Sequence, residues 1–175
     1  MTSRGYAEGT AQMRMPDLEF HSEDACFQVH LPQPLLRKLL KLCRASEQHE
    51  TGGILVGHYS EALDCARVRR VSSPPPDSKR GLAWFERGTK GLQALLDRSW
   101  SSRRDHYLGE WHFHPFAAPI PSATDLRQLM SIARDPRYRC PEPLLLIVGG
   151  DPAGEWSVSV HVVPRDAEAV PLPRV

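Results

Sequence analysis

The stretch Gly109-Glu110-Trp111-His112-Phe113-His114-Pro115 places two histidines two residues apart in a segment that we predict to be a strand, Tyr107–Phe113. Strand side chains alternate between the two faces of a sheet, so His112 and His114 are expected to share one face. The strand rise separates their Cβ atoms by roughly 6.5–7 Å. Two imidazoles at that spacing can converge on one metal ion, which predicts a metal site on this face.

A carboxylate that completes such a site follows in Pro121-Ser122-Ala123-Thr124-Asp125, where Asp125 stands eleven residues after His114. Two histidines, one carboxylate and an open fourth position are the layout of a catalytic zinc rather than a structural one. The same stretch also has the pattern of a helix start at Ser122, with a capping box. An Asp125 that faces zinc is expected not to close that box as well.

A general base is the third element that the chemistry needs, because a hydrolytic zinc site must deprotonate water and later protonate the leaving group. Glu50 is the candidate, since it stands alone ahead of an apolar, glycine-punctuated strand, Gly53–Tyr59. Glu110 shares the face of His112 by strand parity and leaves three roles open. It is an acceptor for an imidazole N–H, an alternative base, or a surface acid.

Together these elements resemble the JAMM metalloprotease motif, also called MPN-plus or JAB. The motif appears here as Glu50 before Gly-Ile-Leu-Val-Gly, then His112-x-His114-Pro115, six residues, and Ser122-x-x-Asp125. The resemblance covers roughly residues 25–163. It implies that zinc is bound by His112, His114 and Asp125, and that Glu50 is the general acid/base. It also implies that the Ser122 hydroxyl helps to stabilise the oxyanion.

The pattern of the whole chain predicts an α/β fold, a single-domain mixed β-sheet flanked by helices, and the resemblance implies JAMM/MPN-like, cytidine-deaminase-like layering. The expected strands are 25–30, 53–59, 66–71, 107–113, 143–148 and 156–163. The expected helices are 34–45, 89–100 and 122–134. We expect a flexible N-terminal tail over residues 1–20, a metalloprotease domain over 21–165 and a C-terminal tail over 166–175.

The composition is typical of a small cytoplasmic enzyme. The 175 residues carry 22 basic and 21 acidic side chains, so there is no strong attraction toward nucleic acid or anionic membranes, and neither is expected as a partner. The sequence has no long apolar run and no signal-peptide core. The four cysteines form no CxxC pair, which suggests small apolar filler residues in a reducing compartment.

The wider sequence from Phe85 to His112 resembles bacterial JAB-type peptidases that act beside ubiquitin-like activating and conjugating enzymes. This resemblance implies an isopeptidase in antiphage defence that releases a ubiquitin-like or C-terminally conjugated protein, which in CBASS systems is a cyclic-nucleotide synthase. Its partners would then be that target and the activating or conjugating enzyme. Residues 72–85 are expected either to form part of the groove for the substrate's tail or to be an ordinary surface loop. The alternatives are a processing protease for a ubiquitin-like or sulfur-carrier precursor, and a non-catalytic MPN interaction module.

Overall fold

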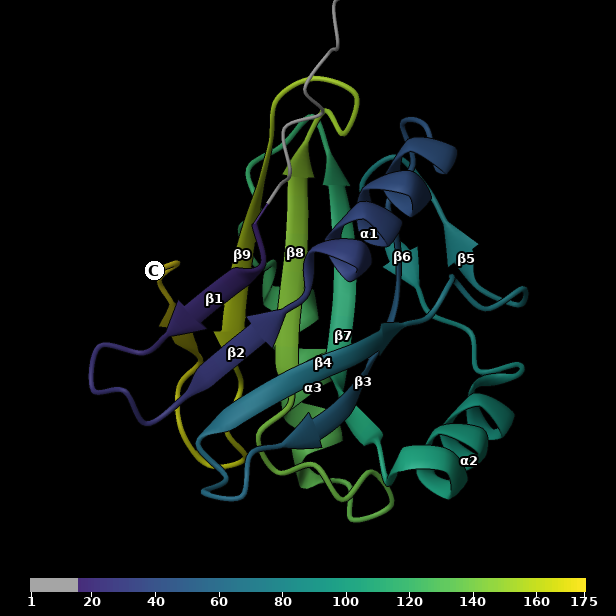
Figure 1. Cartoon of the computed structure of the whole chain (residues 1–175). Coiled ribbons are helices and arrows are strands. Elements are labelled where there is room, and N and C mark those ends of the chain that lie inside the picture. The colour runs from purple at the N-terminus through teal and green to yellow at the C-terminus, as the bar shows by residue number, and fades with distance from the viewer. Residues whose placement is uncertain (1–15) are drawn as a thin grey trace, which may run out of the picture.

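One eight-stranded sheet dominates the computed structural model, which describes residues 16–175 (Figure 1). The strand order is β1-β2-β4-β3-β7-β8-β9-β10. The pairs β2–β4 and β7–β8 are parallel, and the other pairs are antiparallel. The strands are β1 (Leu18–His21), β2 (Gln28–Leu31), β3 (Thr51–Tyr59), β4 (Cys65–Val71), β7 (His106–Pro115), β8 (Leu144–Gly150), β9 (Trp156–Val162) and β10 (Val170–Leu172). This mixed sheet confirms the predicted fold class.

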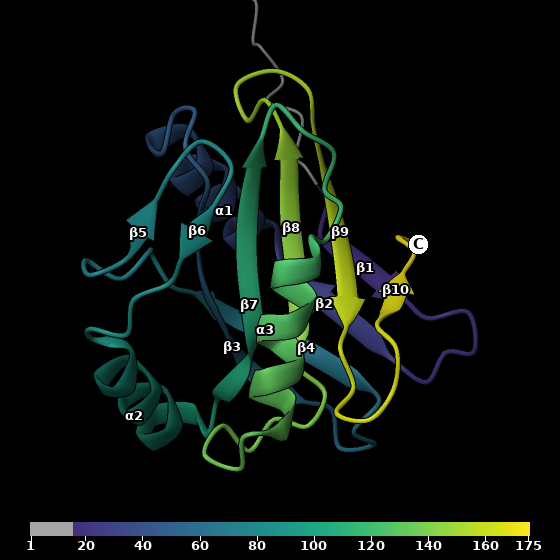
Figure 2. The ribbon, with the colours of Figure 1, turned by 180° about the vertical axis from the view of Figure 1, so that it is seen from behind.

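Helices cover both faces of the sheet. Helix α1 (Gln33–Ala45) lies on one face, and α3 (Ala123–Arg134) lies on the other, which Figure 2 shows from behind. Helix α2 (Leu92–Arg103) contributes Leu92 to the same apolar cluster as α3. In the part of the chain that the structure describes, no helix has the length and apolar character needed to span a bilayer.

The central strand β7 separates two apolar cores. Trp111 and Phe113 are fully buried in the core that α1 covers. The residues that alternate with them along the strand, such as His112, point away from that core and toward α3. A bulge in the β3–β7 pairing interrupts the alternation, because Leu55 pairs with Gly109 and Val56 with Tyr107. Tyr107 therefore lies on the α3 side, the face that also carries Glu110.

The predicted tails are wrong in part. The N-terminal tail was expected to reach residue 20, but Leu18–His21 forms β1, where Leu18 and Phe20 are buried. Residues 1–15 of that predicted tail lie outside the described residues. The C-terminal tail was expected from residue 166, but Val170–Leu172 forms β10 and pairs with β9. The two edge strands of the sheet, β1 and β10, are therefore formed largely by residues that were expected to lie in tails outside the domain.

Three smaller predictions also need correction. Helix α2 begins at Leu92 rather than Thr89, because Gly91 stands at its N-cap with a φ of 85°. Residues expected to be loop contain a small hairpin, β5 (Lys79–Arg80) with β6 (Phe85–Glu86). All four cysteines are free, but Cys26 is exposed rather than a buried filler.

Candidate metal centre

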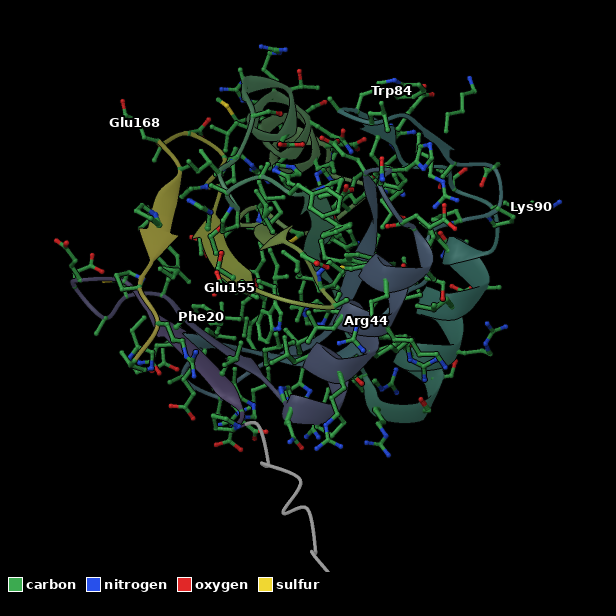
Figure 3. The ribbon with its side chains drawn as sticks, turned by 90° about the horizontal axis from the view of Figure 1, so that it is seen from above. Phe20, Arg44, Trp84, Lys90, Glu155 and Glu168 are labelled. Carbon is green, nitrogen blue, oxygen red and sulfur yellow. The ribbon has the colours of Figure 1, made fainter. Side chains whose placement is uncertain are left out.

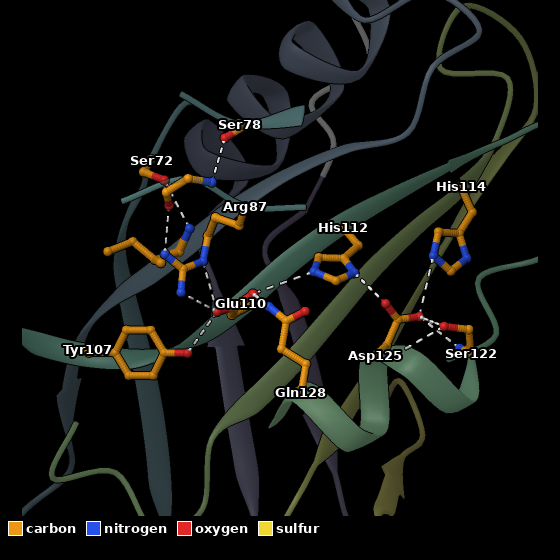
Figure 4. Close-up of polar contacts among 12 residues, drawn as sticks. Ser72, Ser78, Arg87, Tyr107, Glu110, His112, His114, Ser122, Asp125 and Gln128 are labelled. Atoms are coloured by element: carbon orange, nitrogen blue, oxygen red, sulfur yellow. Dashed lines mark hydrogen bonds and ion pairs between the residues drawn. The ribbon is translucent and has the colours of Figure 1, made fainter. Parts of the chain in front are cut away.

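His112, His114 and Asp125 meet at one point on the α3 face of the sheet (Figure 4). Their side chains are 4%, 11% and 11% exposed. His112 Nδ1 lies 2.9 Å from Asp125 Oδ1, and His114 Nε2 lies 3.8 Å from Asp125 Oδ2. Strand β7 supplies the two imidazoles, and the first turn of α3 supplies the carboxylate. The structure thus brings together all three residues that the sequence pattern singled out.

This cluster fits a metal ion by its donors and by its geometry. Each residue offers one ligand atom, and the three atoms lie within 4.8 Å of one another. Two imidazole nitrogens and one carboxylate oxygen are ligands that Zn²⁺ accepts. Asp125 also lies at the N-terminal end of a helix, where the helix dipole favours a negative charge. The donor set and its arrangement therefore fit a metal ion.

Asp125 closes a capping box and faces the histidines at the same time, contrary to the sequence prediction. The Ser122 backbone N–H and hydroxyl donate to Asp125 Oδ2 at 2.8 and 2.7 Å, and the Asp125 N–H donates to Ser122 Oγ at 3.1 Å. The other oxygen, Oδ1, faces His112. The prediction failed because it treated the carboxylate as one group, whereas its two oxygens have separate partners.

Glu50 directly precedes β3, the strand that pairs with the histidine-bearing β7. Gly52 pairs with His112, so the side chain of Glu50 falls on the same face as Gly52 by strand alternation. The Glu50 backbone N–H donates to the Gly81 carbonyl at 3.0 Å, which fastens this segment to the β5–β6 hairpin. Burial raises the pKa of the Glu50 carboxyl, the charge of Asp125 raises it further, and His112 opposes the shift.

Gly52 is required by the close packing around His112. A Cβ atom at this position would lie 2.5 Å from the Trp111 carbonyl oxygen, 2.9 Å from Phe85 and 3.0 Å from the His112 ring. Phe85 of the hairpin meets the His112 ring edge-on, with a centroid distance of 5.9 Å. The glycine two residues after Glu50 therefore lets the strand and the hairpin approach His112 closely.

Glu110 is fully buried behind His112, which excludes the surface-acid interpretation. Arg87 donates to its Oε1 from Nε at 2.9 Å and lies 2.8 Å away through Nη2. Tyr107 donates to Oε1 at 3.4 Å, and Gln128 donates to Oε2 at 3.1 Å. His112 Nε2 lies 3.6 Å from Oε2, an ion-pair distance rather than a hydrogen bond. Both oxygens of this carboxylate already accept hydrogen bonds, and it lies on the opposite side of the His112 ring from Asp125, so it does not face the cluster as a base would.

The charges around His112 define the electrostatics of the site. Burial would lower the pKa of His112, but the neighbouring carboxylates Asp125 and Glu110 raise it to about 9. Burial opposes the ionised form of Asp125, yet the bonds from His112 and Ser122 lower the pKa of its carboxyl. Burial lowers the pKa of His114. At neutral pH a metal ion would therefore replace one proton on His112.

Two turns with exposed apolar side chains adjoin the catalytic candidates. The turn of the β5–β6 hairpin carries Leu82 and Trp84, which are 66% and 52% exposed, and Figure 3 shows Trp84 at the molecular surface. The segment between His114 and Ser122 carries Phe116 and Ile120, which are 67% and 68% exposed. One turn is bonded to Glu50 through the Gly81 carbonyl, and the other follows His114 directly in the sequence.

Sequence reasoning gave no role to the residues that hold Glu110. Gln128 lies three residues after Asp125 on α3, a spacing that places two side chains on one helix face. That signal was available in the sequence. Tyr107 reaches Glu110 only because of the strand bulge, and Arg87 only because of the hairpin. Neither could be predicted from regular alternation.

Comparison with known proteins places the chain in a family. Residues 32–161 match the family of prokaryotic homologues of the JAB domain. A CD-NTase/cGAS isopeptidase of Enterobacter hormaechei subsp. hoffmannii is 39% identical over 165 residues, which cover 94% of this chain and 91% of that protein. A probable metalloprotease of Sinorhizobium fredii is 32% identical over 71% of this chain and 77% of its own length.

The solved structures support the fold. The solution structure of a protein from Desulfitobacterium hafniense superposes with a TM-score of 0.56, at 21% identity, covering 81% of this chain and 86% of that chain. At this identity the similarity concerns the fold alone. The shared fold, the family match and the His112–His114–Asp125 cluster all agree with the JAMM motif found in the sequence. The chain belongs to the prokaryotic JAB family and is a hydrolytic metalloprotease.

Proposed function

We propose that the protein is a zinc-dependent isopeptidase that hydrolyses the amide bond after the C-terminal residue of a conjugated CD-NTase, in bacterial antiphage defence. One observation carries this proposal. The relative named CD-NTase/cGAS isopeptidase aligns over 94% of this chain, so the aligned span includes the positions of the metal cluster, Glu50 and the hairpin. The activating and conjugating enzymes of the same system would supply the conjugate.

The zinc ion would be held by His112, His114 and Asp125. When bound, zinc would polarise the scissile carbonyl and lower the pKa of water toward about 7. The two imidazoles are set by a strand and the carboxylate by a capped helix, which gives rigid ligands. The capping box has a specific consequence, because it fixes Asp125 Oδ2 and leaves Oδ1 facing His112.

Glu50 would accept the proton of the attacking water and pass it to the departing amine. Its raised pKa suits both tasks, because a catalytic pKa closer to the working pH serves donor and acceptor steps alike. No second carboxylate competes for this role within the described site, since both oxygens of Glu110 are engaged.

Ser122 would donate its hydroxyl proton to the developing oxyanion. In the structure this proton goes to Asp125 Oδ2, which also receives the Ser122 backbone N–H at 2.8 Å. The hydroxyl can therefore turn toward a reacting oxygen while Asp125 keeps one donor. Such a donor stabilises the transition state more than the bound substrate.

The substrate's tail would lie extended beside the β5–β6 hairpin. Its backbone would bond to the hairpin edge, and its apolar side chains would contact Trp84 and Phe116. The hairpin is joined to Glu50 through the Gly81 carbonyl, so it can place the scissile amide near the base. This proposal keeps residues 72–85 as part of the groove.

The test is a panel of three substrates with one CD-NTase tail, analysed by mass spectrometry. The tail is presented as an isopeptide-linked conjugate, as a linear C-terminal fusion and as an internal copy within a folded protein. We expect the conjugate to be cut fastest and the internal copy to survive. Cutting of the linear fusion alone would favour a processing protease. Equal cutting of all three would indicate a general endopeptidase and contradict the proposal.

A further inference from the structure

Burying the charged side chain of Glu110 costs desolvation free energy. Its side chain is 0% exposed, and Arg87, its charged partner, is 6% exposed. Removing two charges from water is expensive, and a well-packed apolar pair of similar volume is often as stable or more stable. Stability alone is therefore a weak explanation for the pair. It lies directly behind His112, which suggests a role at the metal centre.

The two oxygens of Glu110 have different surroundings. Oε1 accepts hydrogen bonds from Arg87 and Tyr107. Oε2 accepts a hydrogen bond from Gln128 and lies 3.6 Å from His112 Nε2. His112 Nε2 is buried and has no hydrogen-bond partner among the described residues. One carboxylate oxygen thus points at a polar nitrogen that needs an acceptor.

The His112 ring lies between two carboxylates. Its Nδ1 faces Asp125 at 2.9 Å, on the side where His114 also lies, and its Nε2 faces Glu110 (Figure 4). A neutral imidazole that binds a metal through one nitrogen carries its proton on the other. Since the other ligands lie on the Nδ1 side, the proton belongs on Nε2, opposite Glu110.

We propose that Glu110 is a positioning residue of the metal centre. Its carboxylate, held by Arg87 and Gln128, accepts the Nε2–H of His112 and so directs Nδ1 to the metal. A shift of a few tenths of an ångström from 3.6 Å forms this hydrogen bond. The ring has little freedom to turn elsewhere, because Phe85 packs on its edge and Gly52 lies against Cδ2.

The elements that hold Glu110 give this role its structural basis. Arg87 directly follows β6, so the hairpin is connected to His112 through the Arg87–Glu110 ion pair and the Glu110–His112 contact. Gln128 comes from α3, the helix that also carries Asp125. Glu110 therefore links the hairpin, the central strand and the helix at the point where His112 must be oriented. The inference rests on the proposed metal function but requires no particular substrate.

The first test identifies the bound nitrogen directly in the unaltered protein. Long-range ¹H–¹⁵N spectra of the zinc-loaded chain, with histidines labelled, distinguish a metallated nitrogen from a protonated one. We expect His112 to be metallated at Nδ1 and protonated at Nε2. Metallation of His112 at Nε2 would overturn the proposal, and this measurement depends on no variant.

The second test is the metal affinity of Glu110→Gln, measured by competition with a chelator. Loss of a carboxylate that orients a ligand typically weakens metal binding by about 10–100-fold, and we expect a loss in that range. Glu86→Gln is the control, because Glu86 is exposed on the same hairpin and the change removes the same charge. An affinity of Glu110→Gln equal to that of the control would contradict the inference.

If Glu110→Gln does not fold, Glu110→Asp provides the same test. It keeps the charge for Arg87 but withdraws the carboxylate from His112, so weakened zinc binding is again expected and unchanged binding would refute the role. Neither measurement uses substrate. A protein with this nitrogen assignment that cleaves no conjugate would contradict the proposed function alone, and an active isopeptidase with His112 bound through Nε2 would contradict this inference alone.

Discussion

Replacing Glu50 by glutamine should abolish turnover while preserving the fold and the bound metal. A general acid/base contributes about 10²–10⁴-fold, and we expect the upper end, near 10⁴. The reason is structural, because the nearby Glu110 has both oxygens engaged and cannot substitute. A 10⁴-fold loss corresponds to about 5 kcal/mol of transition-state stabilisation. The assay compares kcat for an isopeptide-linked conjugate, with zinc content measured on the same samples.

The same variant should be more stable than the unaltered protein when both are metal-free at pH 7. A carboxyl whose pKa is raised by folding stabilises the fold while protonated and loses that contribution as the pH rises through the folded pKa. Glu50 is such a group, so its ionised form costs stability that the neutral amide does not. The difference in Tm should shrink as the pH falls toward the ordinary pKa of 4.5.

Glu47→Gln is the matched control for Glu50→Gln, because Glu47 is exposed on the same connecting segment. It should keep full turnover and an unchanged Tm. Cleavage by a zinc-replete Glu50→Gln within tenfold of normal would refute the assignment of the base. A variant that loses zinc together with activity would show that Glu50 acts as a ligand instead.

Three further predictions concern the ligands and their supports. The double variant His112→Ala, His114→Ala should lose its zinc, and a full complement by elemental analysis would refute the ligand assignment. Ser122→Ala should lower kcat by about 10²–10³-fold with little change in KM, and it should cost about 1 kcal/mol as a lost helix cap in denaturant unfolding. Normal kcat with that stability loss would show that Ser122 only caps α3. Gly52→Ala should destabilise the fold by about 1–3 kcal/mol, because its Cβ would meet a backbone oxygen at 2.5 Å. An unchanged Tm would contradict the packing around His112.

The sequence was sufficient for the metal cluster because regular strand alternation governs its two histidines. His112 and His114 are two residues apart on β7 and lie on one face, and Asp125 lies in the first turn of the next helix. The Glu110 network could not be predicted in the same way. Tyr107 would face away from Glu110 in a regular strand, and the bulge reverses its side. Regular strand alternation does not predict such a departure.

The edges of the fold were missed for a different reason. Strands β1 and β10 are short, and pairing with β2 and β9 defines them more than their own composition does. The hairpin strands β5 and β6 have two residues each, too few for any periodic signal. Leu18 and Phe20 alternate with polar residues in the sequence, which is the one local strand signal in this segment.

The most direct test of the proposed function is the mass of the products from a purified CD-NTase conjugate with an isopeptide bond at its C-terminus. We predict that the zinc-loaded protein releases two species whose masses sum to the conjugate plus one water, with the CD-NTase ending at its own C-terminal residue. The same protein stripped of metal should leave the conjugate intact, and returning zinc should restore cleavage. Cleavage within the tail, or an intact conjugate in the presence of the zinc-loaded protein, would contradict the proposed function.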